Sequence, residues 1–292
     1  MSDQPATDPV FAEYRELLFS IAYNMLGSVA DTEDVLQDTW VAWTTRNRAQ
    51  DAEPVTNVRG YLVRVAMNQA LARRADVDRR RETYIGPWLP EPLVDDGTDV
   101  VERAEALSMA VLVVLETLSP LERAVFVLHE VFGYPHTEIA DLLDRTPAAI
   151  RQLAHRAREH VQARRPRQRV DRRVQRQVTE RFIAASGGGD LAALMQLLAP
   201  DVTLWTDGGG KVRRASLHPI HGADKVARFL IGVAQQSGVV EVRYRFVNGD
   251  PSALLFAGES PLTALVLDLG DDGTRVEGVY AVGNPDKLTR ID

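Results

Sequence analysis

The chain has no cysteine among its 292 residues, which excludes disulfide bonds and thiolate metal sites. It also has no apolar run near the roughly 18 residues that a membrane-spanning helix needs. The N-terminal stretch MSDQPATDPV lacks the basic and apolar segments of an export signal. From these absences we expect a cytoplasmic protein that makes no contact with a membrane.

What is present is a globular composition with an uneven distribution of charge. The chain is 45% hydrophobic and 26% charged, and its length predicts two or three domains. The net charge is −7, yet residues 1–143 carry 12 Lys and Arg against 24 Asp and Glu, whereas residues 144–181 carry 12 against 4. A compact cationic block in an acidic chain indicates local contact with a polyanion.

Residues 9–83 are predicted to be helical. Apolar residues in FAEYRELLFSIAYNML recur at the spacing of one helix face. Gly27 is expected to end this helix, and Asp31 to cap the start of the next one, DTEDVLQDTWVAWTTR. A third helix is predicted to begin near Val58 and to run into an arginine-rich end.

The stretch YIGPWLPEPLVDDGTDV has the proline, glycine and acidic residues of a linker with turns. Its WLPEPL core is too apolar for a purely solvated tether, so we expect it to dock on a neighbouring surface. Helices are predicted to resume near Val101 and to continue to about Ala163, where a basic joint follows. Beyond it, helical segments and alternating β-rich runs predict an α+β domain with antiparallel strands.

The segment TEIADLLDRTPAAIRQLAHRARE predicts a helix-turn-helix. Ile139, Leu142 and Leu143 give a short helix one buried face, and the chain then breaks at residues 144–146. Thr146 can cap the next helix, and Pro147 suits its first position because the missing N–H would have no partner there. This order of short helix, tight turn and basic second helix is that of DNA-binding proteins.

The second helix of this motif has an inward and an outward face. Guanidinium and amide groups on the outward face can read base edges or hold phosphates. The alternative is a solvated basic helix in an ordinary bundle. The inward residues are Ile150, Leu153, Ala154 and Ala157, and the outward ones are Arg151, Gln152, His155, Arg156 and Arg158.

An acidic helix near the N-terminus raises a second functional question. Asp31, Asp34 and Asp38 in DTEDVLQDTW share one helix side. Acidic residues near a helix N-terminus favour the helix dipole, which accounts for Asp31 and Asp34 but not for Asp38. The other interpretation is an acidic docking face for a basic partner.

The glycine-rich stretch WTDGGGKV, residues 205–212, has the look of a phosphate loop but fails as one. A Walker loop has four residues between its glycines and Ser or Thr after the lysine, whereas here the glycines are consecutive and Val212 follows. A hairpin turn after VTLW is the simplest explanation.

Taken together, these segments resemble bacterial extracytoplasmic-function (ECF) sigma factors. DTEDVLQDTW is similar to the polymerase-docking helix of their region 2, and GYLVRVAMNQALARRADVDRRR to the segment that recognises the promoter −10 element. LSPLERAVFVLHEVFGYPHTEIADLLDRTPAAIRQLAHRARE resembles region 4, which reads the −35 element. YIGPWLPEPL, DGGGK and NPDKL further resemble motifs of the SigJ-like subgroup, which carries a fused C-terminal SnoaL-like domain.

The resemblance implies two all-α sigma domains followed by an α+β cone of the SnoaL-like/NTF2-like fold. Core RNA polymerase and promoter DNA are the implied partners, no cofactor or metal is implied, and the fused domain is expected to regulate without a separate anti-sigma factor. The implied domains are region 2 at 1–84, a linker at 85–105, region 4 at 106–165 and the SnoaL-like domain at 170–292.

The resemblance also implies roles for individual residues. DNA contacts are expected from Arg59, Arg64 and Asn68 in region 2 and from Arg151, Gln152, His155, Arg156 and Arg158 in region 4. Polymerase contacts are expected from Asp31, Asp34, Gln37 and Asp38. Regulatory contacts are expected from Trp88, Leu89, Pro90, Asp207, Gly208, Gly209, Gly210, Lys211, Asn284, Pro285, Asp286 and Lys287.

Domains of the SnoaL-like fold usually enclose an apolar pocket, which could hold a small ligand. Aromatic side chains at such positions serve as core at least as often as they line a pocket. The candidates for its lining are Trp205, Phe229, Phe246, Phe256 and Tyr280.

Two other functions are alternatives to a sigma factor that catalyses nothing. One is a DNA-binding module fused to a SnoaL-like enzyme, for which Asp207, His218 and His221 are the nearby catalytic candidates. The other is a one-component ligand-responsive repressor, which would have no use for an acidic polymerase-docking face.

Overall fold

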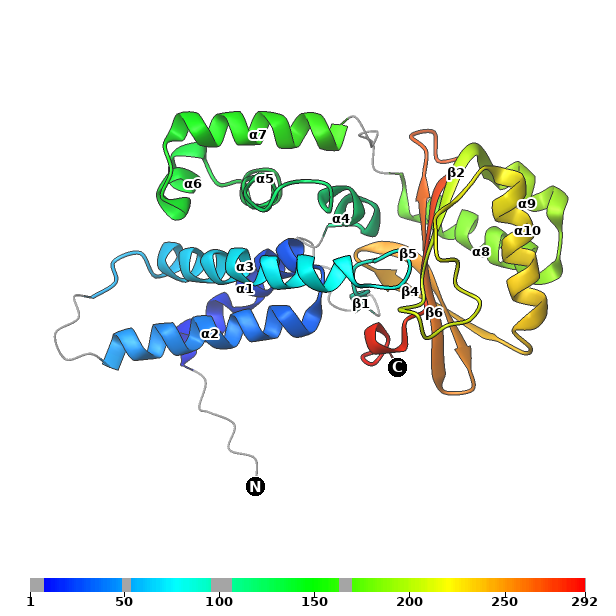
Figure 1. Ribbon diagram of the computed structural model, residues 1–292, viewed down its shortest axis with the longest axis horizontal. Coiled ribbons are helices and arrows are strands. Elements are labelled where there is room, and N and C mark those ends of the chain that lie inside the picture. Colours follow the sequence, from blue (N-terminus) through cyan, green and yellow to red (C-terminus); the bar gives the residue numbers. More distant parts are fainter. Residues whose placement is uncertain (1–7, 49–53, 96–106, 163–169, 292) are drawn as a thin grey trace, which may run out of the picture. The chain divides into compact units, whose positions relative to one another are not determined.

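A computed structural model describes residues 8–48, 54–95, 107–162 and 170–291 (Figure 1). They divide into two compact units. The N-terminal unit takes the described residues up to Arg80 together with Leu115–Val161, and the C-terminal unit takes those from Arg81 to Asp95, Leu107–Val114 and the described residues from Gln162 onward.

The N-terminal unit begins with three long helices, α1 (Pro9–Leu26), α2 (Val29–Arg48) and α3 (Val58–Glu82), the last of which runs two residues past the division. Gly27 ends α1 in the left-handed conformation, as predicted. The prediction that Asp31 caps α2 is wrong, because α2 begins two residues earlier. The Ser28 hydroxyl accepts a hydrogen bond from the Asp31 N–H at 3.3 Å and so lies at the capping position.

The second helical stretch contains the predicted helix-turn-helix. Asp144 takes a left-handed conformation after α6, and the Thr146 hydroxyl accepts a hydrogen bond from the Ala149 N–H at 3.2 Å at the start of α7. Ile150, Ala154 and Ala157 are buried, so the inward face of α7 is as the spacing predicts. The expected start of this stretch near Val101 lies outside the described residues. Its elements are α4 (Met109–Leu115), α5 (Pro120–Phe126), the π-helix η1 (Val127–Val131), α6 (His136–Leu143) and α7 (Pro147–Gln162).

The C-terminal unit is a seven-stranded sheet in the order β1-β4-β5-β6-β7-β2-β3, with helices packed on it. The expected strands are confirmed, but the set is not wholly antiparallel, since β2 pairs with β7 in parallel. The helices are α8 (Arg172–Gly188), α9 (Leu191–Leu197), α10 (Ala223–Gln236) and the 3₁₀ turn η2 (Pro285–Lys287). The strands are β1 (Val94–Asp95), β2 (Leu198–Asp207), β3 (Ile220–His221), β4 (Glu241–Val247), β5 (Asp250–Ala257), β6 (Ser260–Leu269) and β7 (Val276–Val282).

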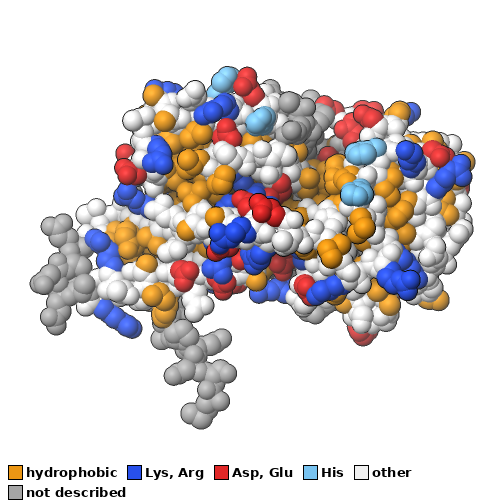
Figure 2. Space-filling view, in the orientation of Figure 1, with side chains coloured by type: hydrophobic (Ala, Val, Ile, Leu, Met, Phe, Trp, Pro, Cys, Tyr) orange, Lys and Arg blue, Asp and Glu red, His pale blue; other side chains and the backbone are white. Residues whose placement is uncertain are grey.

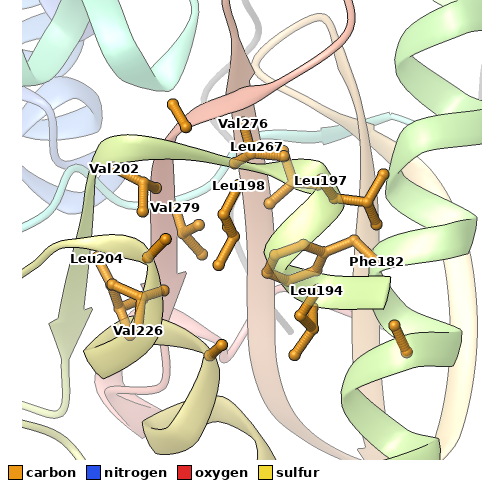
Figure 3. Packing of buried hydrophobic residues seen from close by; sticks show 14 of the residues in the cluster. Phe182, Leu194, Leu197, Leu198, Val202, Leu204, Val226, Leu267, Val276 and Val279 are labelled. Atoms are coloured by element: carbon orange, nitrogen blue, oxygen red, sulfur yellow. The ribbon is translucent and has the colours of Figure 1, made fainter. Parts of the chain in front are cut away.

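Alternation along the strands buries both faces of this sheet. Leu267 and Val279 point to the face covered by α8, α9 and α10, where Phe182 fills the core (Figure 3), and Leu265 belongs to the same cluster. Their neighbours in the sequence point to the opposite face. That second core takes in Leu89 from the linker segment together with residues of α4 and of the C-terminal end.

The five aromatic residues expected to line one pocket are divided between different places. Phe256 and Tyr280 are buried in the second core, with Trp205 packed against it, and the Trp205 and Tyr280 rings stack at 4.9 Å. Phe229 packs on the first core, and the Arg172 guanidinium covers Phe246. The aromatics are therefore core and surface side chains of two faces, and the expectation of a shared pocket wall is wrong.

Candidate functional site

Helix α7 presents the predicted outward face. Arg151, Gln152, His155 and Arg156 are exposed. Figure 2 shows basic and histidine side chains, with a few acidic ones, along the upper edge where Figure 1 draws α7. Arg158 is partly held back, because its Nη2 contacts a Glu130 carboxylate oxygen at 2.5 Å. The exposed cations start from the second turn of a helix whose other face is apolar, a geometry suited to the DNA major groove.

Helix α3 places the region 2 candidates on its surface. Arg59, Arg64 and Asn68 are all exposed, one or two turns apart. The guanidinium of Arg59 also lies over the Tyr134 ring at 5.2 Å, an arrangement that leaves its N–H groups free to donate.

Helix α2 divides its acidic residues into two kinds. Asp34, Gln37 and Asp38 are exposed, although Asp34 also pairs with Arg73. Asp31 is only 5% exposed, and its carboxylate accepts two hydrogen bonds from Arg80, at 2.7 and 2.8 Å.

The expectation that Asp31 belongs to a solvated docking face is therefore wrong. Burial alone would raise the pKa of Asp31, but hydrogen bonds from Arg80 and Arg73 outweigh it, and the pKa is lower than usual. The arginine-rich end of α3 lies alongside α2 and neutralises this carboxylate within the chain.

The glycine stretch begins at a buried carboxylate in the C-terminal unit. Asp207 ends β2 and is 0% exposed. One of its oxygens accepts a hydrogen bond from the Tyr84 hydroxyl at 2.5 Å, and the other accepts from the Leu89 N–H at 2.9 Å. Burial and this hydrogen bond raise the pKa of Tyr84, so the phenol keeps the proton that it donates. The Asp207 side chain therefore lies inside the C-terminal unit and not at the tip of the loop.

Lys287 completes the same cluster from the C-terminal segment. Its ammonium donates to Asp207 at 2.7 Å and to the Leu89 carbonyl at 2.5 Å, and it lies 3.6 Å from the centre of the Trp88 ring. Burial lowers the pKa of Lys287 to about 8, although the Asp207 charge opposes the shift. We call Tyr84, Trp88, Leu89, Asp207 and Lys287 the linker clamp.

The turn that carries Lys287 is built by its own sequence. The Asn284 side chain accepts from the Asp286 N–H at 3.1 Å, and Pro285 occupies the first position of η2, which fixes the turn. The Asn284 amide also donates to the Tyr84 hydroxyl at 2.7 Å. NPDKL therefore holds the clamp lysine against the start of YIGPWLPEPL, and Leu89 and Pro90 are buried there.

The three glycines have a packing reason as well as a conformational one. Gly209 and Gly210 have positive φ, and a Cβ at Gly209 would lie 2.5 Å from the Asn284 amide nitrogen. A Cβ at Gly210 would lie 3.0 Å from Ile85, and one at Gly208 would lie 2.5 Å from the Ala215 Cβ. The expectation of a tight hairpin turn is wrong, since residues 208–219 form a longer loop before β3. The glycines let this loop approach the linker and η2 closely.

An outer ion pair closes the same loop at the surface. Lys211 donates to both Asp286 oxygens, at 2.5 and 2.7 Å, with about half of each side chain or more exposed to solvent. Solvent screens such a pair, so it stabilises much less than the buried cluster.

Tyr84 is the clamp residue that the expected regulatory set omits. The signal was its place at the head of YIGPWLPEPL, but nothing in the local pattern says that its hydroxyl meets a carboxylate 123 positions away. His218 and His221, the remaining catalytic candidates, are both exposed, and Nδ1 of His221 contacts the Thr203 hydroxyl at 3.0 Å. Within the described ranges no three His, Asp or Glu side chains form a metal-binding group, and no helix could span a membrane.

Comparison with known proteins agrees with this arrangement. Family models match residues 10–80 (Sigma-70 region 2), residues 108–161 (Sigma-70, region 4) and residues 179–280 (SnoaL-like domain). A helical pair of this kind joined to a SnoaL-like sheet defines the class as a sigma factor of the Sigma-70 type with a fused C-terminal domain.

Individual relatives narrow the class. The ECF RNA polymerase sigma factor SigJ of Mycobacterium tuberculosis is 36% identical over 96% of this chain and 92% of the relative. The crystal structure of that organism's SigJ matches with a TM-score of 0.75 and 33% identity, covering 96% of this chain and 97% of the other. The probable ECF sigma factor SigI of the same organism is 29% identical over 99% of this chain and 97% of the relative. The chain belongs to the ECF RNA polymerase sigma factors, and we call its N-terminal unit the sigma unit.

Proposed function

We propose that the C-terminal domain of this sigma factor restrains transcription initiation by holding the linker between regions 2 and 4. The partners of the sigma unit are core RNA polymerase and promoter DNA, which places its work in the cytoplasm. The proposed division is region 2 at 1–84, the linker at 85–105, region 4 at 106–165 and the regulatory domain at 170–292.

The linker clamp is the observation that carries this proposal. Asp207 and Lys287 are nearly fully buried, and besides each other they bond to the Tyr84 hydroxyl and to both backbone groups of Leu89, while the Gly209 N–H also donates to Asp207. Breaking a buried pair by removing one partner costs about 3–5 kcal/mol. The clamp can therefore hold the linker firmly, and Leu89 in the second core adds apolar burial.

The length of the held segment supplies the mechanism. A promoter presents its −35 and −10 elements about 25 base pairs apart, which is roughly 85 Å of DNA at ~3.4 Å per base pair. Residues 84–95 would add up to roughly 40 Å of reach when extended. While the clamp holds these residues folded, the sigma factor lacks that reach, so release of the linker favours promoter binding.

The side chains that meet DNA and polymerase are proposed from their exposure and chemistry. Exposed Arg and amide groups suit base edges and phosphates, and exposed carboxylates suit a basic partner surface. The proposed DNA contacts are Arg59, Arg64, Asn68, Arg151, Gln152, His155, Arg156 and Arg158, and the proposed polymerase contacts are Asp34, Gln37 and Asp38.

Regulation is proposed to act within the chain, without a separate anti-sigma factor and without a chemical reaction. The relatives are sigma factors, which are not enzymes. Both Asp207 oxygens are engaged by the chain's own donors, so this carboxylate has a structural use in the clamp. No small ligand is proposed, because the five aromatic candidates face different sides of the sheet.

Transcription in vitro with core polymerase tests the proposal. Lys287→Met keeps the length of the side chain but removes the charge that faces Asp207, and we expect several-fold more transcript than from the parent protein. Lys225→Met is the matched control, because Lys225 is an exposed lysine on α10. Equal transcription by the parent and Lys287→Met would contradict restraint by the clamp.

A further inference from the structure

A second buried ionic cluster lies in the sigma unit, and none of its residues is a proposed DNA or polymerase contact. Arg123 on α5 is 0% exposed, although it carries a permanent charge. Its Nε donates to the Asn24 carbonyl at 2.8 Å, and its Nη1 donates to Glu116 at 2.7 Å. A guanidinium of region 4 thus binds a carbonyl at the end of a region 2 helix.

Region 2 contributes the matching group. Arg74 on α3 is 3% exposed and donates to the Met25 carbonyl at 2.9 Å and to the second Glu116 oxygen at 2.6 Å. One carboxylate from region 4 therefore bridges one arginine from each region. Asp78, one turn along α3, adds a carboxylate to Arg74 from the same helix.

The two carbonyls explain why the arginines meet at this place. Asn24 and Met25 belong to the last turn of α1, where carbonyl groups lack partners within the helix and the dipole favours cations. Arg74 and Arg123 satisfy one carbonyl each. An arginine of region 4 therefore completes a helix of region 2, and this contact exists only while the two regions touch.

Promoter recognition requires the opposite arrangement. Region 2 reads the −10 element and region 4 the −35 element, roughly 85 Å apart on DNA at ~3.4 Å per base pair. An arginine side chain cannot span such a distance. Arg123 must leave Asn24, and Glu116 must leave Arg74, before both elements are occupied.

We propose that Glu116, Arg74 and Arg123 form an ionic latch that keeps regions 2 and 4 together in the free sigma factor and opens on promoter engagement. The latch lies wholly in the sigma unit, so it does not depend on restraint by the C-terminal domain. It rests on the contacts of these three side chains and on their use of the α1 carbonyls.

The ionic character of the latch suits a reversible contact. Burying charges costs solvation that the pair attraction only partly returns, so such clusters specify a geometry while contributing little net stability. Burial lowers the pKa of both Arg74 and Arg123, because the charged form loses solvation inside the protein. Arg123 Nη2 also has no hydrogen-bond partner among the described residues. When the latch opens, the charges regain water.

Distance measurement between the two regions tests the latch in the full chain. The protein has no cysteine, so dyes can be attached at Asn47→Cys on α2 and Asp141→Cys on α6, both exposed positions. Glu116→Gln keeps the size of the side chain and removes the charge that both arginines share. We expect the ratio of open to closed molecules to rise on the order of 100-fold, the change implied by a buried pair that loses one partner.

The matched control is Asp78→Asn, which removes a carboxylate from Arg74 without crossing between the regions. It should keep the energy transfer of the parent, whereas Glu116→Gln should lose transfer with unchanged helix content by circular dichroism. Arg123→Lys keeps the charge but has fewer donors, so its energy transfer should lie between that of the parent and that of Glu116→Gln. This variant gives a second reading of the latch if Glu116→Gln does not fold. Parent-like transfer in both Glu116→Gln and Arg123→Lys would overturn the latch, as would equal loss in Asp78→Asn.

Discussion

The glycine loop of the C-terminal unit and helix α2 of the sigma unit both place a buried carboxylate beside exposed charges. In the loop, Asp207 is buried and is held by segments 80 to 123 positions away in the sequence. In α2, Asp31 is buried and held by arginines of the adjacent helix α3. The two buried carboxylates therefore serve different purposes: Asp31 joins neighbouring helices of one region, whereas Asp207 holds a linker.

The exposed charges differ as well. Lys211 in the loop already has Asp286 as a partner within the chain, while Asp38 on α2 is exposed and lies among residues proposed to meet polymerase. Buried charges in both regions are thus used internally, and the exposed carboxylates of α2 are the ones proposed to meet another molecule. Burial, more than residue type, separates an internal contact from a docking contact.

Replacing the buried loop carboxylate should have the largest effect. Asp207→Asn leaves Lys287 buried without its counter-charge, which should weaken linker docking by about 3–5 kcal/mol. The Leu89 amide donates to Asp207, so its rate of hydrogen exchange measures the weakening of linker docking directly. Asp286→Asn removes the exposed carboxylate of the same loop contact and should leave Leu89 protected. Full protection of Leu89 in Asp207→Asn would contradict the clamp.

Reversing the exposed charges of α2 should act on the partner. Asp34→Lys with Asp38→Lys sets like charges against a basic surface and should weaken polymerase binding by several kcal/mol. Glu13→Lys with Glu16→Lys is the matched control, because it makes the same charge change at exposed positions of α1. Binding is measured by pull-down of core polymerase. If the two double variants retain equal amounts of core polymerase, the α2 surface is not the docking site.

Raising the pH above about 8 should raise the free energy of unfolding through Lys287. Its pKa is about 8 in the folded protein and ordinarily 10.5, so between these values the folded state binds fewer protons than the unfolded state. Stability therefore rises with pH across this window, by at most about 3 kcal/mol, and is unaffected by this group below pH 8. Urea unfolding between pH 7 and 10 should show this gain in the parent and lose it in Lys287→Met. A gain of equal size in Lys287→Met would assign it to another group.

Gly209 should be more sensitive than a glycine of the same backbone conformation. Gly209 and Gly258 have φ of +56° and +60°, so alanine meets similar strain at both, about 1 kcal/mol. Only at Gly209 does a Cβ collide with Asn284, which should add about 1–3 kcal/mol as in other overpacked sites. Chemical denaturation of Gly209→Ala and Gly258→Ala compares the two. Equal losses of stability would show that the loop does not need its close approach to η2.

Loss of the outer ion pair between Lys211 and Asp286 should have the smallest effect on linker docking. Lys211→Ala removes a contact between two half-exposed side chains, which is worth about 0–1 kcal/mol. Leu89 exchange should stay close to that of the parent. If Lys211→Ala released the linker as strongly as Asp207→Asn, the distinction between inner and outer pairs would fail.

Local signals in the sequence predicted much of this architecture. Gly27 marks the end of α1, and Thr146 with Pro147 marks the start of α7, because capping and turn chemistry are local. Apolar spacing identified the inward faces of both helices. The resemblance of three short motifs also placed Trp88, Asp207 and Lys287 in one expected regulatory set, although it predicted none of their contacts.

Local sequence signals did not predict the contacts between segments that are distant in the sequence. The burial of Asp31 depends on where the end of α3 packs, and the meeting of Glu116 with Arg74 joins residues 42 positions apart. The aromatic candidates were misassigned because alternation sends neighbouring strand residues to opposite faces and spacing alone does not say which strands pair, while Phe229 lies on helix α10. Each of these misses concerns long-range packing rather than local conformation.

A reversible lock on the linker tests the central claim most directly. The chain has no cysteine, and a Cβ at Gly210 would lie 3.1 Å from the Ile85 Cβ, so Ile85→Cys with Gly210→Cys can form a disulfide after a small adjustment. If the linker must leave the C-terminal domain for initiation, the oxidised double variant should transcribe at least about tenfold less than the same protein after reduction. Neither single variant should respond to reductant. Equal transcription by the oxidised and reduced double variant would contradict regulation through linker release.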